Sequence, residues 1–310
     1  MDLLPGPDED AAVARLRPVL DAHLGVERWA ERLRTGASVP ATLLADATAA
    51  GLLSEPSMTA QALMAVELGR VLAPLDLLAA VLGAHALADR SDAAGRPAVR
   101  ASVAAPNGEG GHAVFGPGDP DVVVVWDDDG IGIATEIDHV AMVDSIDPTT
   151  PMALARIGSV ERTSDAVGLR AALLAAAFHA GTARGARDMA VEYAQTRVQF
   201  DRPIGANQAV KHLCADSATR SEAAWASVLY ASVSLVEDRP DARYHVAVAA
   251  RIAADAARRN ARTNIQVHGG RGYTLDCPAH LFLVRTQILE TLAGGARRAR
   301  RDLLADVPTA

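Results

Sequence analysis

Three side chains suited to binding a phosphate-containing ligand stand at what we expect to be the end of a helix. Arg197, Gln199 and Phe200 come just before Pro203 and Gly205, which stop the preceding helix. A guanidinium makes forked hydrogen bonds to phosphate, and an aromatic ring can stack on a purine. The pattern therefore indicates a charged, partly planar ligand. The alternative interpretation is that Arg197 pairs with a carboxylate and Phe200 fills the core.

A second stretch, Q-V-H-G-G-R-G-Y-T over residues 266–274, places Gln266 before Gly269 and Gly270. Without a Cβ, glycine lets backbone N–H groups approach phosphate oxygens. The two stretches together resemble the acyl-CoA dehydrogenase family, whose members carry R-x-Q-F-G-x-P-I followed by a Gln, and later Q-x-x-G-G-x-G-[FY]-T. In this chain Asp201 stands where the first motif has its glycine, and Gln208 supplies the Gln.

The resemblance implies a mainly α fold with a small middle β domain. We expect an N-terminal helical domain over 1–90, a shortened antiparallel β domain over 91–163 and a C-terminal four-helix bundle over 164–310. It also implies FAD, bound through Arg197, Gln199, Phe200, Gln208, Gln266, Gly269 and Gly270. The reaction of the family is α,β-desaturation of an acyl-CoA thioester, in which a carboxylate base removes the α proton while hydride leaves the β carbon for the flavin.

Both sequence positions at which the family places this base lack a carboxylate here. The turn after the fourth C-terminal helix holds Gly294, and the alternative position on the first C-terminal helix falls near Ala171. Glu290 is the fallback, one helical turn before Gly294 and about 6 Å along the axis. Asp165 and Glu161 are further alternatives (both precede the first C-terminal helix). Because catalysis falls steeply when a base is misplaced, we expect no catalytic residue in this chain.

The segment D-C-P-A-H-L-F-L-V-R over 276–285 resembles W-E-H-P-A-H-L-Y-L-K-R of one branch of the family. That branch includes short subunits of bacterial α2β2 acyl-CoA dehydrogenases, which degrade bulky CoA thioesters such as steroid side chains. The middle-domain motif T-E-P-x-x-G-S-D is missing. The resemblance therefore implies a subunit that supplies the FAD adenosine and pyrophosphate half-site to a longer homologous partner. The partner would hold most of the acyl-CoA, and electron-transfer flavoprotein would be the acceptor.

Two other hypotheses stay open at this point. One is a self-sufficient homomeric acyl-CoA dehydrogenase with a displaced base, and the other is a helical scaffold that binds no flavin. The colour of the purified protein distinguishes the three. A yellow chain supports the homomeric enzyme, a chain that is yellow only with a partner supports the shared site, and a colourless chain supports the scaffold.

Composition agrees with closely packed helices and excludes several classes of protein. Half of the residues are hydrophobic but only 4% are aromatic, and a net charge of −8 without a basic stripe argues against a nucleic-acid partner. Two cysteines, Cys214 and Cys277, indicate a reducing compartment, although one bridge stays open. The acidic start (M-D-L-L-P-G-P-D-E-D) is unlike a signal or transit peptide, and no uninterrupted apolar run is long enough for a membrane span. We expect a cytoplasmic protein without membrane insertion.

The elements that would position these residues follow from periodicity. Helical spacing covers residues 8–88, most clearly at 59–72, and returns in four helices at 169–193, 208–235, 243–267 and 279–292. Between them, short β-branched runs at 98–104, 122–126, 131–135 and 139–143 predict strands, with a hairpin turn at 127–130. We interpret the acidic triplet Asp127–Asp129 as turn residues and expect no metal site.

Overall fold

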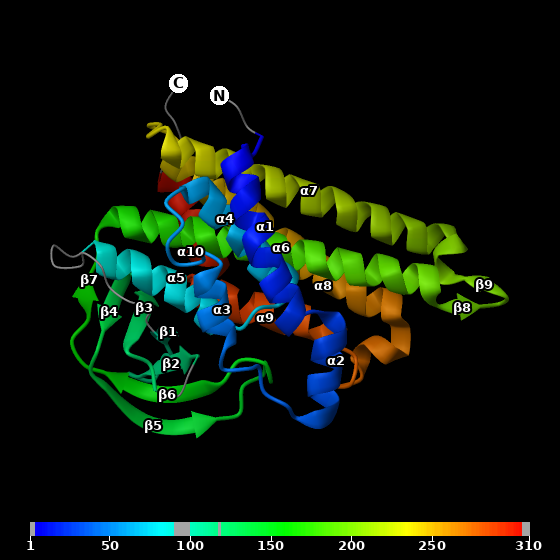
Figure 1. The fold of residues 1–310 in the computed structure, drawn as a ribbon, viewed down its shortest axis with the longest axis horizontal. Helices are drawn as coiled ribbons and strands as arrows, with labels where there is room; N and C mark the ends of the chain where they lie inside the picture. The colour runs from blue at the N-terminus through cyan, green and yellow to red at the C-terminus, as the bar shows by residue number, and fades with distance from the viewer. Residues whose placement is uncertain (1–3, 90–99, 117–118, 306–310) are drawn as a thin grey trace.

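The computed structural model describes residues 4–89, 100–116 and 119–305, and three regions follow one another along the chain (Figure 1). The N-terminal helices are α1 (Pro7–His23), α2 (Val26–Thr35), α3 (Leu43–Ala49), α4 (Met58–Arg70) and α5 (Leu75–Ala88). The C-terminal helices are α6 (Asp165–Thr196), α7 (Gln208–Val236), α8 (Ala242–His268), α9 (Ala279–Leu292) and α10 (Gly295–Ala305). The predicted helices are present. α3 lies inside the region 8–88 that was expected to be helical, and the short α10 is additional to the four predicted C-terminal helices.

The middle region is a seven-stranded sheet with the order β5-β6-β2-β1-β3-β4-β7. Its strands are β1 (Ala101–Pro106), β2 (His112–Phe115), β3 (Val122–Asp127), β4 (Gly130–Ala134), β5 (Ile137–Val143), β6 (Met152–Ile157) and β7 (Glu161–Arg162). The expectation of an antiparallel sheet is wrong for one pair, because β1 lies parallel to β3. The chain leaves β2 and crosses to the far side of β1 before it forms β3. Residues 98–99 of the first predicted strand lie outside the described residues.

The predicted hairpin is confirmed: β3 pairs with β4 through Asp127 and Gly130, and Gly130 adopts a positive φ of 114°. The Asp127 carboxylate in this turn pairs with Arg162, with one N–O distance of 2.7 Å. Between β3 and β4, the short connection places Trp126 and Ile131 opposite one another in register. The hairpin thereby presents both residues toward the helices that follow.

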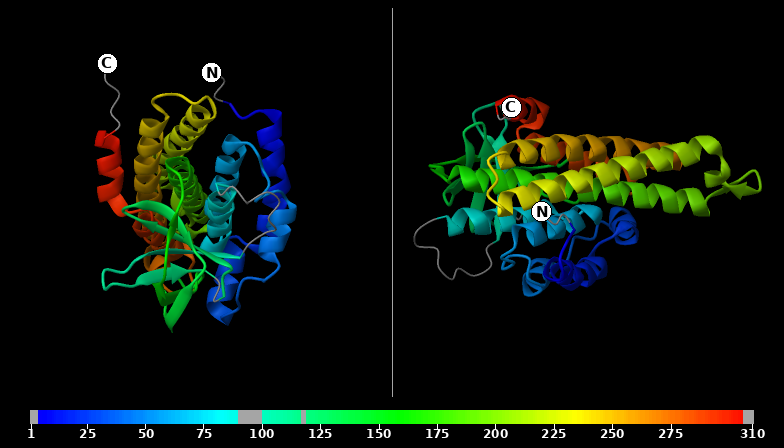
Figure 2. Two further views of the ribbon diagram at one scale, coloured as in Figure 1. Left: turned by 90° about the vertical axis from the view of Figure 1, so that its left-hand side faces the viewer. Right: turned by 90° about the horizontal axis from the view of Figure 1, so that it is seen from above.

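Helix α6 is the centre of the molecule, packed between α4 on one side and α7 and α8 on the other (Figure 1). Its 32 residues include a stretch long and apolar enough to cross a membrane by length and composition, but 72% of that stretch is buried inside the protein. It is therefore the core helix of the bundle. The sheet lies near the N-terminal end of α6, and the far end of the bundle projects away from the sheet (Figure 2).

Glycine lets α4 and α6 cross at close range, as the small residues of the sequence predict. A Cβ added at Gly181 would overlap the carbonyl oxygen of Val66, and one at Gly69 would overlap the carbonyl of Phe178. The two helix backbones therefore touch without intervening side chains. Such a contact leaves no room for even one methyl group unless the helices move apart.

We expect Gly181→Ala to lower the free energy of unfolding by about 1–3 kcal/mol through overpacking. The matched control is Gly168→Ala in the same helix, where a Cβ meets nothing within 4 Å. There the same substitution should leave stability unchanged or raise it, because alanine favours a helix by up to about 1 kcal/mol over glycine. Urea unfolding followed by circular dichroism measures both. Equal effects at the two positions would contradict the close-contact interpretation.

Arg285 joins the three regions at a fully buried point. Its Nε donates to Asp147 at 2.6 Å, and the two side chains are 1% and 0% exposed. Nη1 donates to the carbonyl oxygens of Leu72 and Ala73 after α4, and Nη2 donates to Thr149. The guanidinium thus links the end of an N-terminal helix, the connection before β6 and α9.

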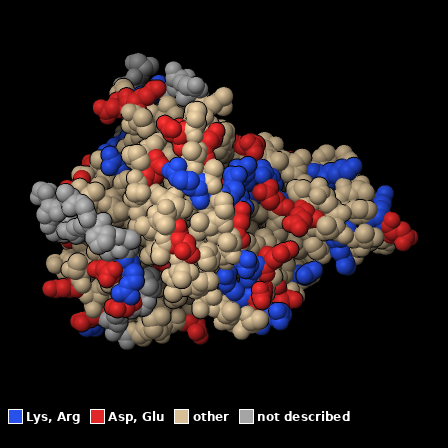
Figure 3. All heavy atoms as spheres, in the orientation of Figure 1, with Lys and Arg blue, Asp and Glu red and all other residues tan. Residues whose placement is uncertain are grey.

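The surface carries both signs of charge. On the face drawn in Figure 3, acidic and basic side chains are interspersed over the helices, and basic groups extend to the narrow end of the bundle. Cys214 and Cys277 are both free thiols, so the single bridge that the sequence left open is not formed. Residues 198–203 of the first motif lie at this narrow end (Figure 1).

Candidate functional site

The first motif forms a hairpin at the far end of the bundle, which we call the tip (Figure 2). Strands β8 (Val198–Gln199) and β9 (Arg202–Pro203) pair in antiparallel fashion around a two-residue turn. Phe200 and Asp201 in that turn have positive φ values of 53° and 61°, a conformation that costs a non-glycine residue roughly 1–2 kcal/mol. Asp201, which stands where the family motif has a glycine, therefore adopts the left-handed conformation that glycine favours.

The second motif lies beside the first because the ends of α6 and α8 pack together. Tyr193 stacks on His268 with ring centroids 4.0 Å apart, and Ile204 and Val267 share one small hydrophobic cluster. Arg197 lies one helical turn after Tyr193, and its backbone N–H donates a hydrogen bond to the carbonyl oxygen of Tyr193 at 2.9 Å. The two motifs, about 70 residues apart in sequence, thus meet within a few residues of this ring stack.

Every predicted cofactor-binding side chain at the tip is exposed. Arg197, Gln199, Phe200, Gln208 and Gln266 all face solvent, and Phe200 is 91% exposed. The alternative interpretation of the motif is therefore wrong, since Phe200 is outside the core and Arg197 has no carboxylate partner within the described part of the chain.

The backbone at the second motif is equally open. Gly269 has a φ of 58°, and a Cβ added at Gly269 or Gly270 would meet nothing within 4 Å. Gln208 begins α7, where its amide lies 3.3 Å from the imidazole of His212. The Gly269 N–H donates to the carbonyl oxygen of Gln266. The guanidinium of Arg197 and the amide of Gln266, beside the exposed ring of Phe200 and an open glycine backbone, fit a ligand that carries phosphate and a purine.

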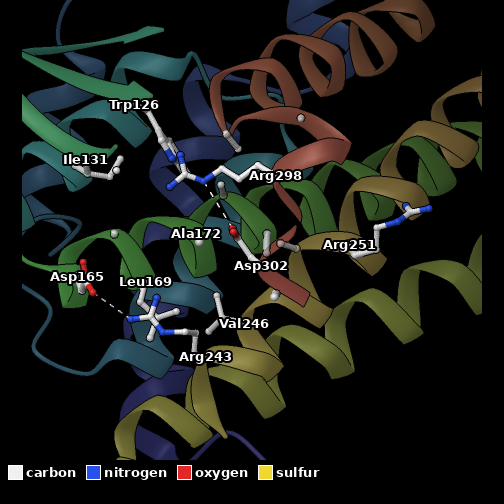
Figure 4. Close-up of a pocket in the computed structure, with 18 of the residues that line it drawn as sticks. Trp126, Ile131, Asp165, Leu169, Ala172, Arg243, Val246, Arg251, Arg298 and Asp302 are labelled. Carbon is white, nitrogen blue, oxygen red and sulfur yellow. Dashed lines mark ion pairs between the residues drawn. The ribbon is translucent and has the colours of Figure 1, made fainter. Parts of the chain in front are cut away.

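A cavity of about 330 Å³ lies at the opposite end of α6, between the sheet and the bundle. Trp126 and Ile131 form its wall on the sheet side, and α6, α8 and the segment from α9 to α10 form the rest (Figure 4). The helices contribute mainly small residues: Ala172, Ala175 and Ala176 from α6, and Val246, Ala247, Ala250 and Ala254 from α8. Short side chains on two facing helices leave the space between them open.

The charged residues around this cavity are paired with one another. Arg243 lies 3.5 Å from Asp165, and Arg298 lies 3.7 Å from Asp302 within α10 (Figure 4). Arg298 also donates to the carbonyl oxygen of Asp127 in the hairpin turn, which connects α10 to the sheet. The rim is therefore polar but largely compensated in charge.

The two expected base positions differ in their relation to this cavity. Ala171 is fully buried and lies outside the cavity wall, whereas its neighbour Ala172 lines it. Gly294 sits in the turn between α9 and α10, as predicted, with a φ of 85°, and its neighbours Ala293 and Gly295 line the cavity. Neither position carries a group that can accept a proton.

The fallback residue Glu290 does line the cavity. Both of its carboxylate oxygens accept hydrogen bonds from Nη1 of Arg258, at 3.0 and 3.1 Å. Asp255 holds the other side of that guanidinium at 3.0 Å. A carboxylate fixed in this pair is directed at an arginine, whereas a general base must reach a substrate proton.

The sequence motifs did not indicate His179 or the cavity. His179 lines the cavity from α6 and is only 3% exposed. Positions 172, 175, 176 and 179 follow the i, i+3, i+4, i+7 spacing of one helix face, and 243, 246, 247, 250 and 254 on α8 do the same. That spacing of small residues was the available signal, but alone it also describes an ordinary helix contact.

Comparisons with known proteins identify relatives of each part of the chain. Residues 169–307 match a family described as "Acyl-CoA dehydrogenase, C-terminal domain". Acyl-CoA dehydrogenase IpdE2 from Mycobacterium tuberculosis is 33% identical over 258 residues, which cover 79% of this chain and 77% of that protein. Acyl-CoA dehydrogenase FadE34 from the same organism is 43% identical over 136 residues, 44% of this chain.

The matched region of FadE34 is only 19% of that protein, so the chain spans about a fifth of one curated relative and about three quarters of another. Among solved structures, the ChsE4-ChsE5 complex from Mycobacterium tuberculosis has a chain that superposes with a TM-score of 0.76 at 23% identity, with complete coverage of both chains. At that identity the likeness concerns the fold.

Proposed function

Because this chain belongs to the acyl-CoA dehydrogenase family, we propose that it supplies the half-site for the adenosine and pyrophosphate of FAD to a partner subunit. The assembled enzyme would desaturate an acyl-CoA thioester between its α and β carbons. When bound, FAD supplies the acceptor for the hydride that leaves the β carbon. The partner is a longer homologous subunit, and electron-transfer flavoprotein is the electron acceptor from the assembly.

One observation carries this proposal: the tip and the cavity stand at opposite ends of α6. Asp165, the first residue of α6, lines the cavity, and Arg197 directly follows its last residue. The cavity follows α6 as far as His179, so 18 residues, or about 27 Å at about 1.5 Å per residue, separate its nearest α6 residue from Arg197. A flavin with its adenosine half on the tip would have to span that distance to place its ring in this cavity. This separation favours a flavin whose ring lies in another chain.

The exposed groups of the tip have complementary roles in this proposal. The Arg197 guanidinium binds the pyrophosphate, and the open backbone at Gly269 and Gly270 approaches the adenosine half together with Gln266. Gln199 and Gln208 add amide donors, and the Phe200 ring stacks on a planar group. The side chains of Arg197, Gln199 and Gln266 have no partner among the described residues, and burying them is costly unless a ligand satisfies them, which favours a polar partner for this surface.

The chain leaves the proton transfer to its partner. Gly294 and Ala171 cannot accept a proton, and Glu290 is held by Arg258. The partner would contribute the base, the flavin-ring pocket and most contacts to the acyl-CoA. The resemblance of residues 276–285 to one branch of the family supports a bulky CoA thioester, of the steroid side-chain type, as the substrate class.

We expect Arg197→Ala to lower the affinity of the complex for FAD by about 10- to 150-fold. The lost bond is a charged hydrogen bond, worth about 1.5–3 kcal/mol. Titration of FAD into the deflavinated complex, followed by flavin absorbance, measures the change. The matched control is Arg202→Ala on the same hairpin, whose guanidinium donates to Asn207 at 3.0 Å. The control should bind FAD within about twofold of the unmodified complex.

Flavin retention separates this proposal from its alternatives. Unchanged affinity in Arg197→Ala would mean that the cofactor lies elsewhere. Flavin retained by the chain without a partner would support a homomeric enzyme, for which the position of Glu290 in the cavity wall is the one structural argument. A chain that stays colourless with a longer homologue present would support a scaffold that binds no flavin.

A further inference from the structure

His179 is a buried polar side chain without a partner. It is 3% exposed, and neither ring nitrogen forms a hydrogen bond with any residue that the structure describes. Its Nδ1 is sealed from solvent, yet the ring contributes to the wall of the cavity between the sheet and the bundle. Of the two ring nitrogens, only Nε2 is therefore accessible to a ligand in the cavity. Buried polar groups are nearly always hydrogen-bonded, so this exception calls for a partner that enters the cavity.

The proton of the neutral ring belongs on Nε2. Burial and the nearby charge of Arg258 lower the pKa of His179 to about 3, so the imidazole stays neutral near pH 7. A neutral imidazole has one N–H donor and one acceptor nitrogen. A buried N–H without an acceptor is rarer than a buried acceptor without a donor. We therefore assign the unprotonated, acceptor nitrogen to the inaccessible Nδ1 and the proton to Nε2. Nε2 then presents an N–H donor to the cavity.

The face of the wall that α6 and α8 form is mainly apolar, while Thr163, Ser164 and paired charged residues make up much of the rest. Alanines and Val246 surround the space, while Asp165, Asp302 and Glu290 are each paired with an arginine. The volume of about 330 Å³ is within the range of small-molecule pockets, roughly 300–1,000 Å³. An ionic ligand would have to break an ion pair or bury an uncompensated charge, which is unfavourable.

We propose that this cavity binds a neutral, mainly apolar molecule whose acceptor oxygen takes a hydrogen bond from Nε2–H of His179. This rests on the proposed function, in which Glu290 of the wall is committed to Arg258 and removes no proton, so the molecule is bound there without being desaturated. The site lies at the end of α6 opposite the FAD half-site, so the two proposals can fail separately. His179 is the residue that selects for the oxygen.

A matched pair of probes tests this: camphor, a compact ketone, and camphene, a hydrocarbon of similar size. Isothermal titration calorimetry with the full-length chain should give saturable binding of camphor. His179→Phe should weaken camphor binding by on the order of tenfold and leave camphene binding within about twofold, because only the hydrogen bond is lost. His179→Gln, which keeps an N–H donor on a side chain of similar reach, should restore most of the affinity for camphor.

Two further variants define the location. Ala250→Phe, at a half-buried position of the wall, should abolish binding of both probes by filling the cavity, and it tests the site even if His179→Phe does not fold. Arg197→Ala should leave camphor binding unchanged while it weakens FAD binding by the complex. Absence of saturable camphor binding by the unmodified chain, or equal camphor affinity in His179→Phe, would overturn the proposal.

Discussion

Purified without any partner, this chain is expected to give no measurable reduction of an electron acceptor by an acyl-CoA. The expected cause is that neither residue at the two family positions, Gly294 and Ala171, can remove the α proton. Loss of a general base typically lowers a rate by about 10²- to 10⁴-fold. The measurement is dye reduction with acyl-CoA esters of different chain length and bulk, in the presence of added FAD.

The control for this result is the complex with a longer homologue, which should reduce the dye with its substrate. Glu290→Gln in this chain should leave the rate of the complex unchanged, because Glu290 is committed to Arg258. Turnover by a partner-free preparation that disappears in Glu290→Gln would show instead that the displaced carboxylate acts as the base. Such a result would favour the homomeric enzyme.

Removal of the charge from Arg285 is expected to cost about 3–5 kcal/mol of unfolding free energy. Arg285→Met leaves the carboxylate of Asp147 buried without its partner, and breaking a buried pair on one side has a cost of this size. The carbonyl oxygens of Leu72 and Ala73 and the hydroxyl of Thr149 also lose their donor. Guanidinium chloride unfolding measures the change, with circular dichroism as the signal.

An exposed pair provides the matched control. Arg15 lies 3.1 Å from Glu55, with its side chain 52% exposed, and Arg15→Met should cost less than about 1 kcal/mol. A double variant, Arg285→Met with Asp147→Leu, should recover part of the loss, because it removes the uncompensated charge as well as the pair. Equal costs for Arg285→Met and Arg15→Met would contradict the structural importance of the buried pair.

The sequence predicted the parts of this molecule that depend on local pattern. Helices α6, α7, α8 and α9 follow from periodic apolar spacing, and their observed ends agree with the predicted ends within a few residues. The two motifs of the tip were recognised from their residue types and from their resemblance to the motifs of the family. Their meeting could not be predicted in this way, since it depends on the stack between Tyr193 and His268, 75 positions apart in the chain.

Features that depend on contacts between residues far apart in the sequence could not be predicted. The parallel pairing of β1 with β3 depends on where the chain crosses the sheet, and short strands carry no signal for direction. Arg285 and Asp147 are 138 residues apart, so nothing near either residue in the sequence indicates their pairing. The cavity beside His179 exists because two rows of small side chains face each other, which requires knowledge of how α6 and α8 cross.

The length of α6 has a consequence for how such a chain can change over generations. Substitutions separated by more than about 7–10 Å usually act independently on free energy, and the two ends of this helix are about 48 Å apart. Selection on the end proposed to bind FAD would therefore leave the other end free to vary, as long as the helix itself stays packed. A duplicated gene could therefore lose the catalytic residues at one end of this helix through a few substitutions. It would still be retained if the other end completed a binding site of a partner subunit.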